Sequence, residues 1–222
     1  MPSRVAEHAD VSKVAGRPDN ALLPLGPTLV LLPGLDGTEV FLRPLVAALS
    51  PTIRSVVISY PVSGAEGYGD VLEVVRRATA EFSEFYVLGL SFSGPLAVML
   101  AAEEPKRVKG VILAATFIRV PRPALKRLRL ACNGPMLWMW RIFRRVPIID
   151  VSSALRRCKQ PILCISFRGD RVVPYRNVED IMREAPTATH ATIPGGHFTG
   201  CTSSGLLAAE VEQFLARVEV RR

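Results

Sequence analysis

The chain has 222 residues, of which 49% are hydrophobic and 22% charged, a composition that favours one soluble globular domain over two separate ones. Its net charge of +8 suggests an anionic partner, but eight basic residues and no acidic ones lie between positions 119 and 145, while the remaining 20 basic and 20 acidic residues balance. No recognised DNA-binding or RNA-binding motif accompanies this charge, so nucleic-acid binding is not expected.

The cysteines and the N-terminal region bear on where the protein works. None of the four cysteines has a neighbour at a metal-binding spacing such as CxxC, and a chain of this size needs no disulfide, so reduced thiols in a cytoplasm are expected. Charged residues of both signs occupy positions 4 to 19, which argues against a signal peptide. The apolar stretch at 21–35 is interrupted by prolines, and no run reaches the roughly 18 residues of a membrane-spanning helix.

From residue 28 onward, short apolar runs alternate with segments of helical periodicity, after a polar and unpatterned arm over residues 1–20. This alternation is typical of an α/β fold with a parallel sheet and crossover helices, which we expect in a single domain over residues 21–222. The predicted strands cover 28–33, 54–60, 85–90, 109–115, 161–166 and 189–193. The predicted helices cover 40–49, 68–82, 92–104, 175–184 and 203–219.

Residues 117–157 break this alternation, because they are far too long for a simple crossover between two strands. The segment has a helical pattern, carries the cationic cluster and contains both tryptophans, Trp138 and Trp140. Long insertions of this kind commonly form lids. One interpretation is a cap whose apolar side roofs a pocket while its arginines are solvated. The other is that it makes weak contact with an anionic lipid surface, or with the headgroup or coenzyme part of an acyl substrate.

The stretch GLSFSGP at residues 89–95 places two serines where a predicted strand turns directly into a helix. A strand ending in small-x-Ser-x-small is typical of a nucleophile elbow, in which the residues two before and two after the strained serine nearly touch and must be small. For Ser91 these positions hold Gly89 and Ser93. For Ser93 the second position would hold Pro95, whose ring does not fit, so Ser91 is the candidate nucleophile. The alternative is that Ser91 merely ends a strand and Ser93 caps a helix.

A serine hydroxyl needs a general base and an acid that orients the base. His197 follows two glycines in the loop beyond the last predicted strand, and Asp170 follows Gly169 beyond the strand before it. Taken singly, each has an ordinary alternative: a loop histidine without function, and an aspartate that stabilises a turn or caps a helix. Together Ser91, Asp170 and His197 occur in that chain order after strands, where open parallel sheets bind ligands. His190, at the start of a strand, is expected to be structural.

An oxyanion intermediate needs two preorganised backbone donors. Phe92, the residue after the candidate nucleophile, offers one amide. The stretch LLPGLDGT offers the other, the amide of Leu35 after Gly34, although this stretch alone is equally consistent with a plain Pro-Gly turn. Asp36 beside it is a candidate for a polar substrate contact, with a turn-stabilising role as the alternative. The stretch lacks the lysine and the spacing of a phosphate-binding P-loop.

These stretches, together with ATFIRVPRP, GDRVVP and GGHF, resemble a group of small, mostly bacterial α/β-hydrolases with an LPGxDG loop and an SFSG elbow. The resemblance spans roughly residues 28–120 and 160–218. It implies an α/β-hydrolase fold with a predominantly parallel sheet flanked by helices, a lid inserted at about 117–157, and hydrolysis through an acyl-enzyme without a metal or organic cofactor. It also implies these roles: Ser91 as nucleophile, Asp170 as acid, His197 as base, and Leu35 and Phe92 as donors of the oxyanion amides.

Two positions depart from the superfamily pattern, but neither change removes a backbone donor. Ser93 replaces the usual second glycine of G-x-S-x-G, and Pro33-Gly34 replaces the usual His-Gly.

The sequence therefore predicts a serine esterase that cleaves small-molecule carboxylic esters, preferably with apolar acyl chains of short to medium length. Asp36, Trp138 and Trp140 are the predicted substrate contacts. The same triad also serves thioester hydrolysis, perhydrolysis, C–C bond hydrolysis or acyl transfer, since it fixes how the acyl group is captured and not its donor or acceptor. A catalytically silent ligand-binding module is the alternative from a different class.

Overall fold

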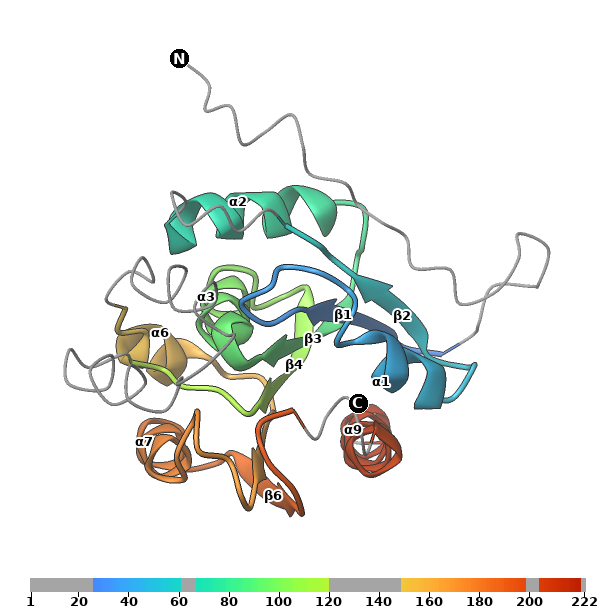
Figure 1. Ribbon diagram of the computed structural model, residues 1–222. Helices are drawn as coiled ribbons and strands as arrows, with labels where there is room; N and C mark the ends of the chain where they lie inside the picture. Colours follow the sequence, from blue (N-terminus) through green and yellow to red (C-terminus); the bar gives the residue numbers. More distant parts are fainter. Residues whose placement is uncertain (1–25, 61–66, 120–148, 199–203, 221–222) are drawn as a thin grey trace.

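The computed structural model describes residues 26–60, 67–119, 149–198 and 204–220 (Figure 1). Within these ranges six strands form one sheet in the order β2-β1-β3-β4-β5-β6, and every neighbouring pair is parallel. The strands are β1 (Thr28–Leu32), β2 (Arg54–Val57), β3 (Phe85–Leu90), β4 (Val108–Ala114), β5 (Ile162–Phe167) and β6 (Thr189–Ile193). The predicted parallel α/β architecture is confirmed.

Helices cover both faces of this sheet, as Figure 1 shows. The helices are α1 (Arg43–Ala48), α2 (Tyr68–Ala78), α3 (Gly94–Glu103), α6 (Ser152–Arg157), α7 (Arg176–Glu184) and α9 (Ser204–Val220). Buried side chains of α1 and α9 belong to one apolar cluster, and those of α2, α3, α6 and α7 belong to another. No helix in the described ranges is long and apolar enough to cross a membrane.

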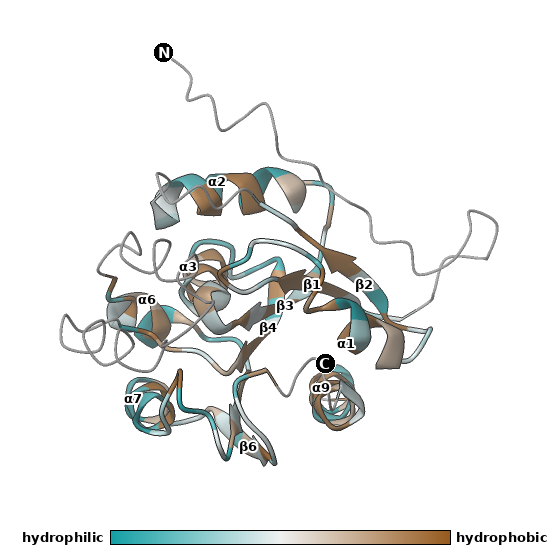
Figure 2. Cartoon of the chain, in the orientation of Figure 1, coloured by the Kyte–Doolittle hydropathy of each residue, from teal (hydrophilic) through white to brown (hydrophobic). Residues whose placement is uncertain are grey.

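The central strands β1, β3, β4 and β5 are apolar in nearly continuous runs because both faces of the sheet are covered there, whereas the edge strand β6 is only partly buried. Successive side chains of a strand point to opposite faces, and β1 illustrates the result. Leu29 and Leu31 belong to the cluster with α1 and α9, whereas Val30 and Leu32 belong to the other, and all four are fully buried. Figure 2 shows hydrophobic colouring on β1 and hydrophilic colouring on parts of the surrounding helices.

Most predicted boundaries agree with the structure within one or two residues. The strand predicted over 54–60 ends at Val57, because Tyr60 leaves the sheet and its amide donates to the carbonyl of Gly37 in the loop after β1 at 3.0 Å. The helix predicted over 68–82 ends at Ala78. Beyond it the amides of Ala80 and Phe82 donate to carbonyls three residues earlier instead of four, and two carbonyls of this stretch also bind a distant arginine.

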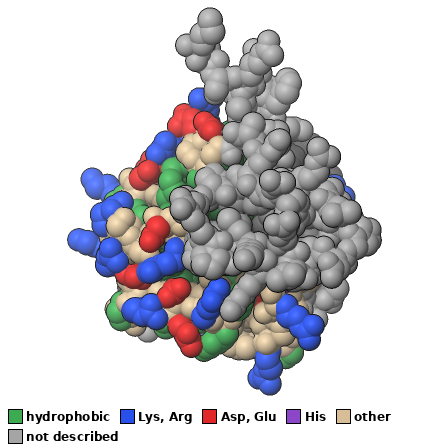
Figure 3. All heavy atoms as spheres, turned by 60° about the vertical axis from the view of Figure 1, so that its left-hand side comes forward, with side chains coloured by type: hydrophobic (Ala, Val, Ile, Leu, Met, Phe, Trp, Pro, Cys, Tyr) green, Lys and Arg blue, Asp and Glu red, His purple; other side chains and the backbone are tan. Residues whose placement is uncertain are grey.

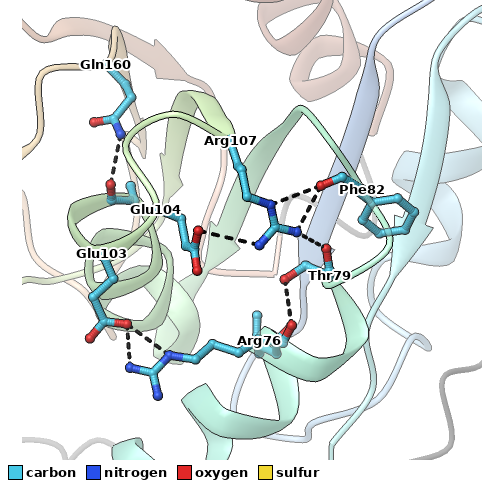
Figure 4. Close-up of polar contacts among 9 residues, drawn as sticks. Arg76, Thr79, Phe82, Glu103, Glu104, Arg107 and Gln160 are labelled. Carbon is cyan, nitrogen blue, oxygen red and sulfur yellow. Dashed lines mark hydrogen bonds and ion pairs between the residues drawn. The ribbon is translucent and has the colours of Figure 1, made fainter.

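That arginine, Arg107, lies just before β4 and joins the carboxyl end of α2 to the body of the fold (Figure 4). Its guanidinium donates to the carbonyl of Phe82 at 3.1 and 2.9 Å and to that of Thr79. Nearby, Arg76 Nε donates to Glu103 at 3.0 Å, which connects α2 with α3. Cationic side chains at a helix C-terminus satisfy carbonyls that have no partner within the helix. These contacts anchor the edge of the sheet at which the strands begin.

The predicted insertion over residues 117–157 ends in a segment that packs on the sheet layers. Ala154 and Leu155 of α6 are buried in the same cluster as α3, against which α6 packs. Arg119 and Asp150 form an antiparallel bridge where the segment leaves and rejoins the described chain. Outside the described residues lie the rest of the predicted lid (120–148), with Trp138 and Trp140, and the predicted arm (1–20).

Basic and acidic side chains are interspersed on the described part of the face in Figure 3. Several form ion pairs across elements or along one helix, including Arg76 with Glu103, Arg156 with Glu184, and Arg183 with Asp180. Exposed pairs of this kind contribute about 0 to 1 kcal/mol each. The interspersed signs accord with the balance of charge outside residues 119–145.

Candidate active site

The chain passes from β3 into α3 through one tight turn, η2 (Ser91–Ser93). Ser91 has a φ of 52°, in the left-handed region that a residue with a side chain rarely adopts. A Cβ atom on Gly89 would lie 2.5 Å from the carbonyl oxygen of Ser93, so position 89 accepts only glycine without a shift. Pro95 lies in the first turn of α3, where its missing amide hydrogen costs nothing. The predicted tight turn and its limit on size at Gly89 are confirmed.

Three residues that lie far apart in the sequence form a continuous hydrogen-bonded chain at this turn. The Ser91 hydroxyl lies 3.0 Å from Nε2 of His197, and Nδ1 of His197 lies 2.7 Å from Oδ2 of Asp170. The side chain of Asp170 is 3% exposed and that of His197 is 11% exposed. The structure therefore brings together the three side chains that chain order predicted, with His197 between Ser91 and Asp170.

The carboxylate of Asp170 is oriented by its own loop as well as by the histidine. Its Oδ1 accepts the amides of Val172 and Val173 at 2.8 and 2.7 Å, while Oδ2 faces His197. Oδ1 thus has the turn-stabilising role that was the alternative for this residue, while Oδ2 contacts the imidazole of His197. Both can operate together.

The loops that carry Asp170 and His197 are hydrogen-bonded to each other. The amide of Gly169 donates to the carbonyl of Gly195 at 2.7 Å, and a Cβ on Gly169 would lie 3.1 Å from that same oxygen. Gly195 has a φ of 117°, which favours glycine. The glycines before Asp170 and His197 therefore permit a close approach of the two loops.

The two amides predicted to bind an oxyanion belong to Phe92, within the turn, and to Leu35, in the loop after β1. Leu35 and Phe92 are buried, and neither amide donates a hydrogen bond to another residue in the described part of the chain. The carbonyl of the Ser91–Phe92 peptide accepts the Thr116 hydroxyl and the Gly94 amide, which fixes the plane of that peptide and so the direction of the Phe92 amide. A Cβ on Gly94 would overlap Thr116, so this contact also requires glycine.

Two buried tyrosines that no sequence motif indicated, Tyr68 and Tyr60, support the turn through hydrogen bonds. The Tyr68 hydroxyl donates to the Phe92 carbonyl at 3.1 Å, and the two rings stack with centroids 4.6 Å apart. The Tyr60 hydroxyl donates to the Pro33 carbonyl at 2.8 Å and contacts the Ser93 hydroxyl. Burial raises the pKa of both tyrosines, so both phenols stay protonated. No motif signals these contacts, because they join residues from separate elements.

Two other residues singled out in the sequence have ordinary contacts. Oδ2 of Asp36 accepts the amide of Thr38 at 3.2 Å and also its hydroxyl, so the turn-stabilising alternative is present, and a substrate contact stays a prediction. His190 Nε2 lies 2.9 Å from the Ser166 hydroxyl on the neighbouring strand, as expected of a structural histidine. Burial lowers the pKa of His190, which keeps it neutral near pH 7.

Exposed apolar side chains lie beside His197. The ring of Phe198 stands edge-on to that of His197 with centroids 5.4 Å apart, and Phe41 lies 6.0 Å from Phe198. Phe41, Phe198 and nearby Val40 are 38%, 45% and 56% exposed among the described residues. An apolar rim of this kind, next to a polar triad, suits an apolar substrate group. No sequence motif indicates this rim, because Phe41 and Phe198 lie on different loops.

The thiols and acids of the described chain form no evident metal centre. Cys158 and Cys164 are free, and burial raises the pKa of the Cys158 thiol to about 11 and that of Cys164 to about 12. Both therefore stay protonated near neutral pH. Within the described residues no group of three or more His, Cys, Asp or Glu side chains is placed to hold a metal ion. Cys132 and Cys201 lie outside these residues.

The all-parallel sheet flanked by helices and the solved structures that superpose on it show that the chain has the α/β-hydrolase fold. The carboxylesterase CesB (YbfK) of Bacillus subtilis superposes with a TM-score of 0.65 at 16% identity, covering 86% of this chain and 84% of that one. The fold implied by the sequence resemblance is confirmed.

Curated relatives of similar length are hydrolases at low identity. A poly(3-hydroxyalkanoate) depolymerase of Ectopseudomonas oleovorans is 22% identical over 245 residues, which cover 87% of this chain and 86% of the relative. The pyrrolizixenacetamide deacetylase of Xenorhabdus hominickii is 26% identical over 225 residues, which cover 78% of this chain and 84% of the relative. No family model matches the chain.

The contact between Gly89 and the Ser93 backbone makes a stability prediction. Gly89→Ala should lower the free energy of unfolding by about 1 to 3 kcal/mol, because the added methyl group overlaps backbone that cannot move without displacing Ser91. Gly69→Ala in α2 is the matched control, since nothing lies within 4 Å of its Cβ position, and a gain of about 0.5 to 1 kcal/mol is expected. Urea unfolding measures both, and equal changes in the two variants would contradict the assignment.

Proposed function

We propose that the protein is a serine hydrolase that cleaves carboxylic esters through an acyl-enzyme. The observation that carries this proposal is the hydrogen-bonded chain from Ser91 through His197 to Asp170, next to a strained turn at the carboxyl edge of a parallel sheet. Similarity to a depolymerase, a deacetylase and a carboxylesterase supports it.

In the proposed first step, Oγ of Ser91 attacks the ester carbonyl carbon while its proton passes to Nε2 of His197. The electron pair of the carbonyl bond moves to oxygen and gives a tetrahedral oxyanion. Oδ2 of Asp170 accepts the hydrogen bond from Nδ1, which leaves Nε2 free to take the proton and stabilises the imidazolium that forms.

The amides of Leu35 and Phe92 donate to the oxyanion in this proposal, and a single donor of this type is worth about 2.7 to 4 kcal/mol. The bond to the alcohol then breaks, and His197 gives its proton to the leaving oxygen. Water next loses a proton to the same Nε2 as it attacks the acyl carbon. Collapse of the second intermediate releases the carboxylic acid and returns the proton to Ser91.

The apolar rim formed by Val40, Phe41 and Phe198 supports a preference for apolar acyl groups of short to medium length. Thioester hydrolysis and acyl transfer to an alcohol or peroxide would use the same acyl-enzyme with a different donor or acceptor. Substrate contacts by Trp138 and Trp140, weak contact of the basic segment with an anionic lipid surface, and a cytoplasmic location stay predictions of the sequence.

A fluorophosphonate probe tests the nucleophile. Wild-type protein should label, and Ser91→Ala should not, because the probe reacts with an activated serine hydroxyl. Ser166→Ala is the matched control, because it removes a second serine hydroxyl that lies within hydrogen-bond distance of a histidine, 2.9 Å from His190, and it should label as the wild type does. Failure of the wild type to label, or labelling of Ser91→Ala, would refute the proposed function.

The acid is tested by Asp170→Asn, which keeps an oxygen for the amides of Val172 and Val173 but changes the group that faces His197. The kcat for p-nitrophenyl butyrate should fall about 10⁴-fold, because the histidine is then held in the wrong tautomer. The midpoint of urea unfolding should change little. A variant with wild-type kcat would remove Asp170 from the proposed mechanism.

The apolar rim is tested with p-nitrophenyl esters of two lengths. Phe198→Ala should lower kcat/KM for the octanoate about 10-fold more than for the acetate, because a longer chain buries more apolar surface against the rim. Val220→Ala, at the far end of α9 and 87% exposed, is the control and should leave both values unchanged. Equal losses for the two esters with Phe198→Ala would show that the rim does not select the chain.

A further inference from the structure

One tyrosine holds both ends of the loop at residues 33–37, which contains the amide of Leu35. The Tyr60 hydroxyl donates to the carbonyl oxygen of Pro33 at 2.8 Å, and the Tyr60 amide donates to the carbonyl of Gly37 at 3.0 Å. Tyr60 follows β2, and its side chain is 4% exposed. The chain beyond β2 therefore clamps the loop that follows β1.

Ser93 reaches the same carbonyl from the elbow. Its hydroxyl donates to the Pro33 oxygen and contacts the Tyr60 hydroxyl, and its side chain is fully buried. Two hydroxyl protons serve the three contacts among these oxygens, so at least one hydroxyl donates to Pro33 in every arrangement, and either hydroxyl alone can do so. Burial raises the pKa of Tyr60, which keeps its phenol a donor at every pH at which an esterase is assayed.

The loop needs such a clamp because glycine follows Pro33. Among the described residues, a Cβ on Gly34 would meet only the Asp36 carboxylate within 4 Å. Gly34 is buried but has no side chain, so its backbone restricts rotation of the peptide that carries the Leu35 amide less than another residue would. The Gly37 amide holds that peptide directly by donating to its Gly34 carbonyl at 3.0 Å. The bonds of Tyr60 and Ser93 to Pro33, and of the Tyr60 amide to the Gly37 carbonyl, limit the rotation further.

On the basis of the proposed function, we propose that Tyr60 and Ser93 are positioning residues that hold the Leu35 amide in place relative to Ser91. Neither is required to touch the substrate, because both act through the Pro33 carbonyl. Loss of one hydroxyl leaves the other on the shared acceptor, whereas loss of both leaves a buried carbonyl without a donor. The effects of the two substitutions on kcat should therefore be more than multiplicative.

The experiment compares Tyr60→Phe, Ser93→Ala and the double variant in hydrolysis of p-nitrophenyl butyrate. Each single variant should lower kcat several-fold at unchanged KM, and the double variant should lower it about 10²-fold to 10³-fold, the loss found when one oxyanion donor is removed. Tyr86→Phe is the matched control, because it removes another buried phenol hydroxyl, which donates to Glu219 at 2.5 Å away from the elbow. It should keep the wild-type kcat.

Two measurements separate positioning from a loss of folded protein. Titration of active sites with the fluorophosphonate gives kcat per competent site, which a merely structural role would leave unchanged. Affinity for a trifluoromethyl ketone, which forms a tetrahedral adduct with a serine, should fall in parallel with kcat. If the wild type is an active enzyme, an unchanged kcat per titrated site in the double variant would overturn the proposal.

Hydrogen exchange tests the clamp without reference to activity, so its failure can be told from failure of the proposed function. The Gly37 amide donates to the Gly34 carbonyl at 3.0 Å and should exchange faster in the double variant but not in Tyr86→Phe. Unchanged exchange at Gly37 in the double variant overturns the proposal even if the wild type hydrolyses no ester. If the double variant does not fold, the same measurements on the two single variants test the proposal. Each should show a lower kcat per titrated site and faster exchange of the Gly37 amide, and wild-type values for both would overturn the proposal.

Discussion

The fold and the candidate site both depend on the single turn at which β3 becomes α3. Ser91 there has a φ of 52°, and such a conformation costs about 1 to 3 kcal/mol, so it persists only where its surroundings permit nothing else. Gly89 contacts the Ser93 backbone on one side, and Gly94 contacts Thr116 on the other. The strand that leads into the turn lies between β1 and β4 and is buried along almost its whole length. The strain is therefore held by the part of the molecule that is least able to yield.

The parallel arrangement of every strand pair explains how residues far apart in the sequence meet at this turn. The loops after β1, β3, β5 and β6 leave the sheet at the same edge, whereas Arg107 and its partners occupy the opposite edge. The edge with Arg107 can therefore stabilise the fold, while the opposite edge carries the candidate site. At the edge with the candidate site the loops also bind each other, since the Gly169 amide donates to the Gly195 carbonyl. Asp170 and His197 are therefore placed by a shared backbone contact as well as by their own side chains.

The sequence was sufficient for those features that depend on local pattern and chain order. The strand β3 was predicted residue for residue, and Ser91, Asp170 and His197 were found because each follows a recognisable strand. The contact that caps the carboxyl end of α2 was not predictable, because it comes from Arg107, which lies 28 residues beyond Thr79. Tyr60 was missed for the same reason, since a tyrosine after a strand carries no sign that its hydroxyl will meet a carbonyl 27 residues earlier.

Ser93 shows how a departure from a common pattern acquires a physical meaning only in three dimensions. Size alone does not explain the serine, because a glycine would satisfy the close contact with Gly89 equally well. A buried hydroxyl without a partner costs about 1 to 3 kcal/mol, so its presence requires an acceptor. The Pro33 carbonyl is that acceptor, and it belongs to a different loop. The elbow and the loop at 33–37 are consequently one hydrogen-bonded unit, in which the geometry of Ser91 and that of the Leu35 amide cannot vary independently.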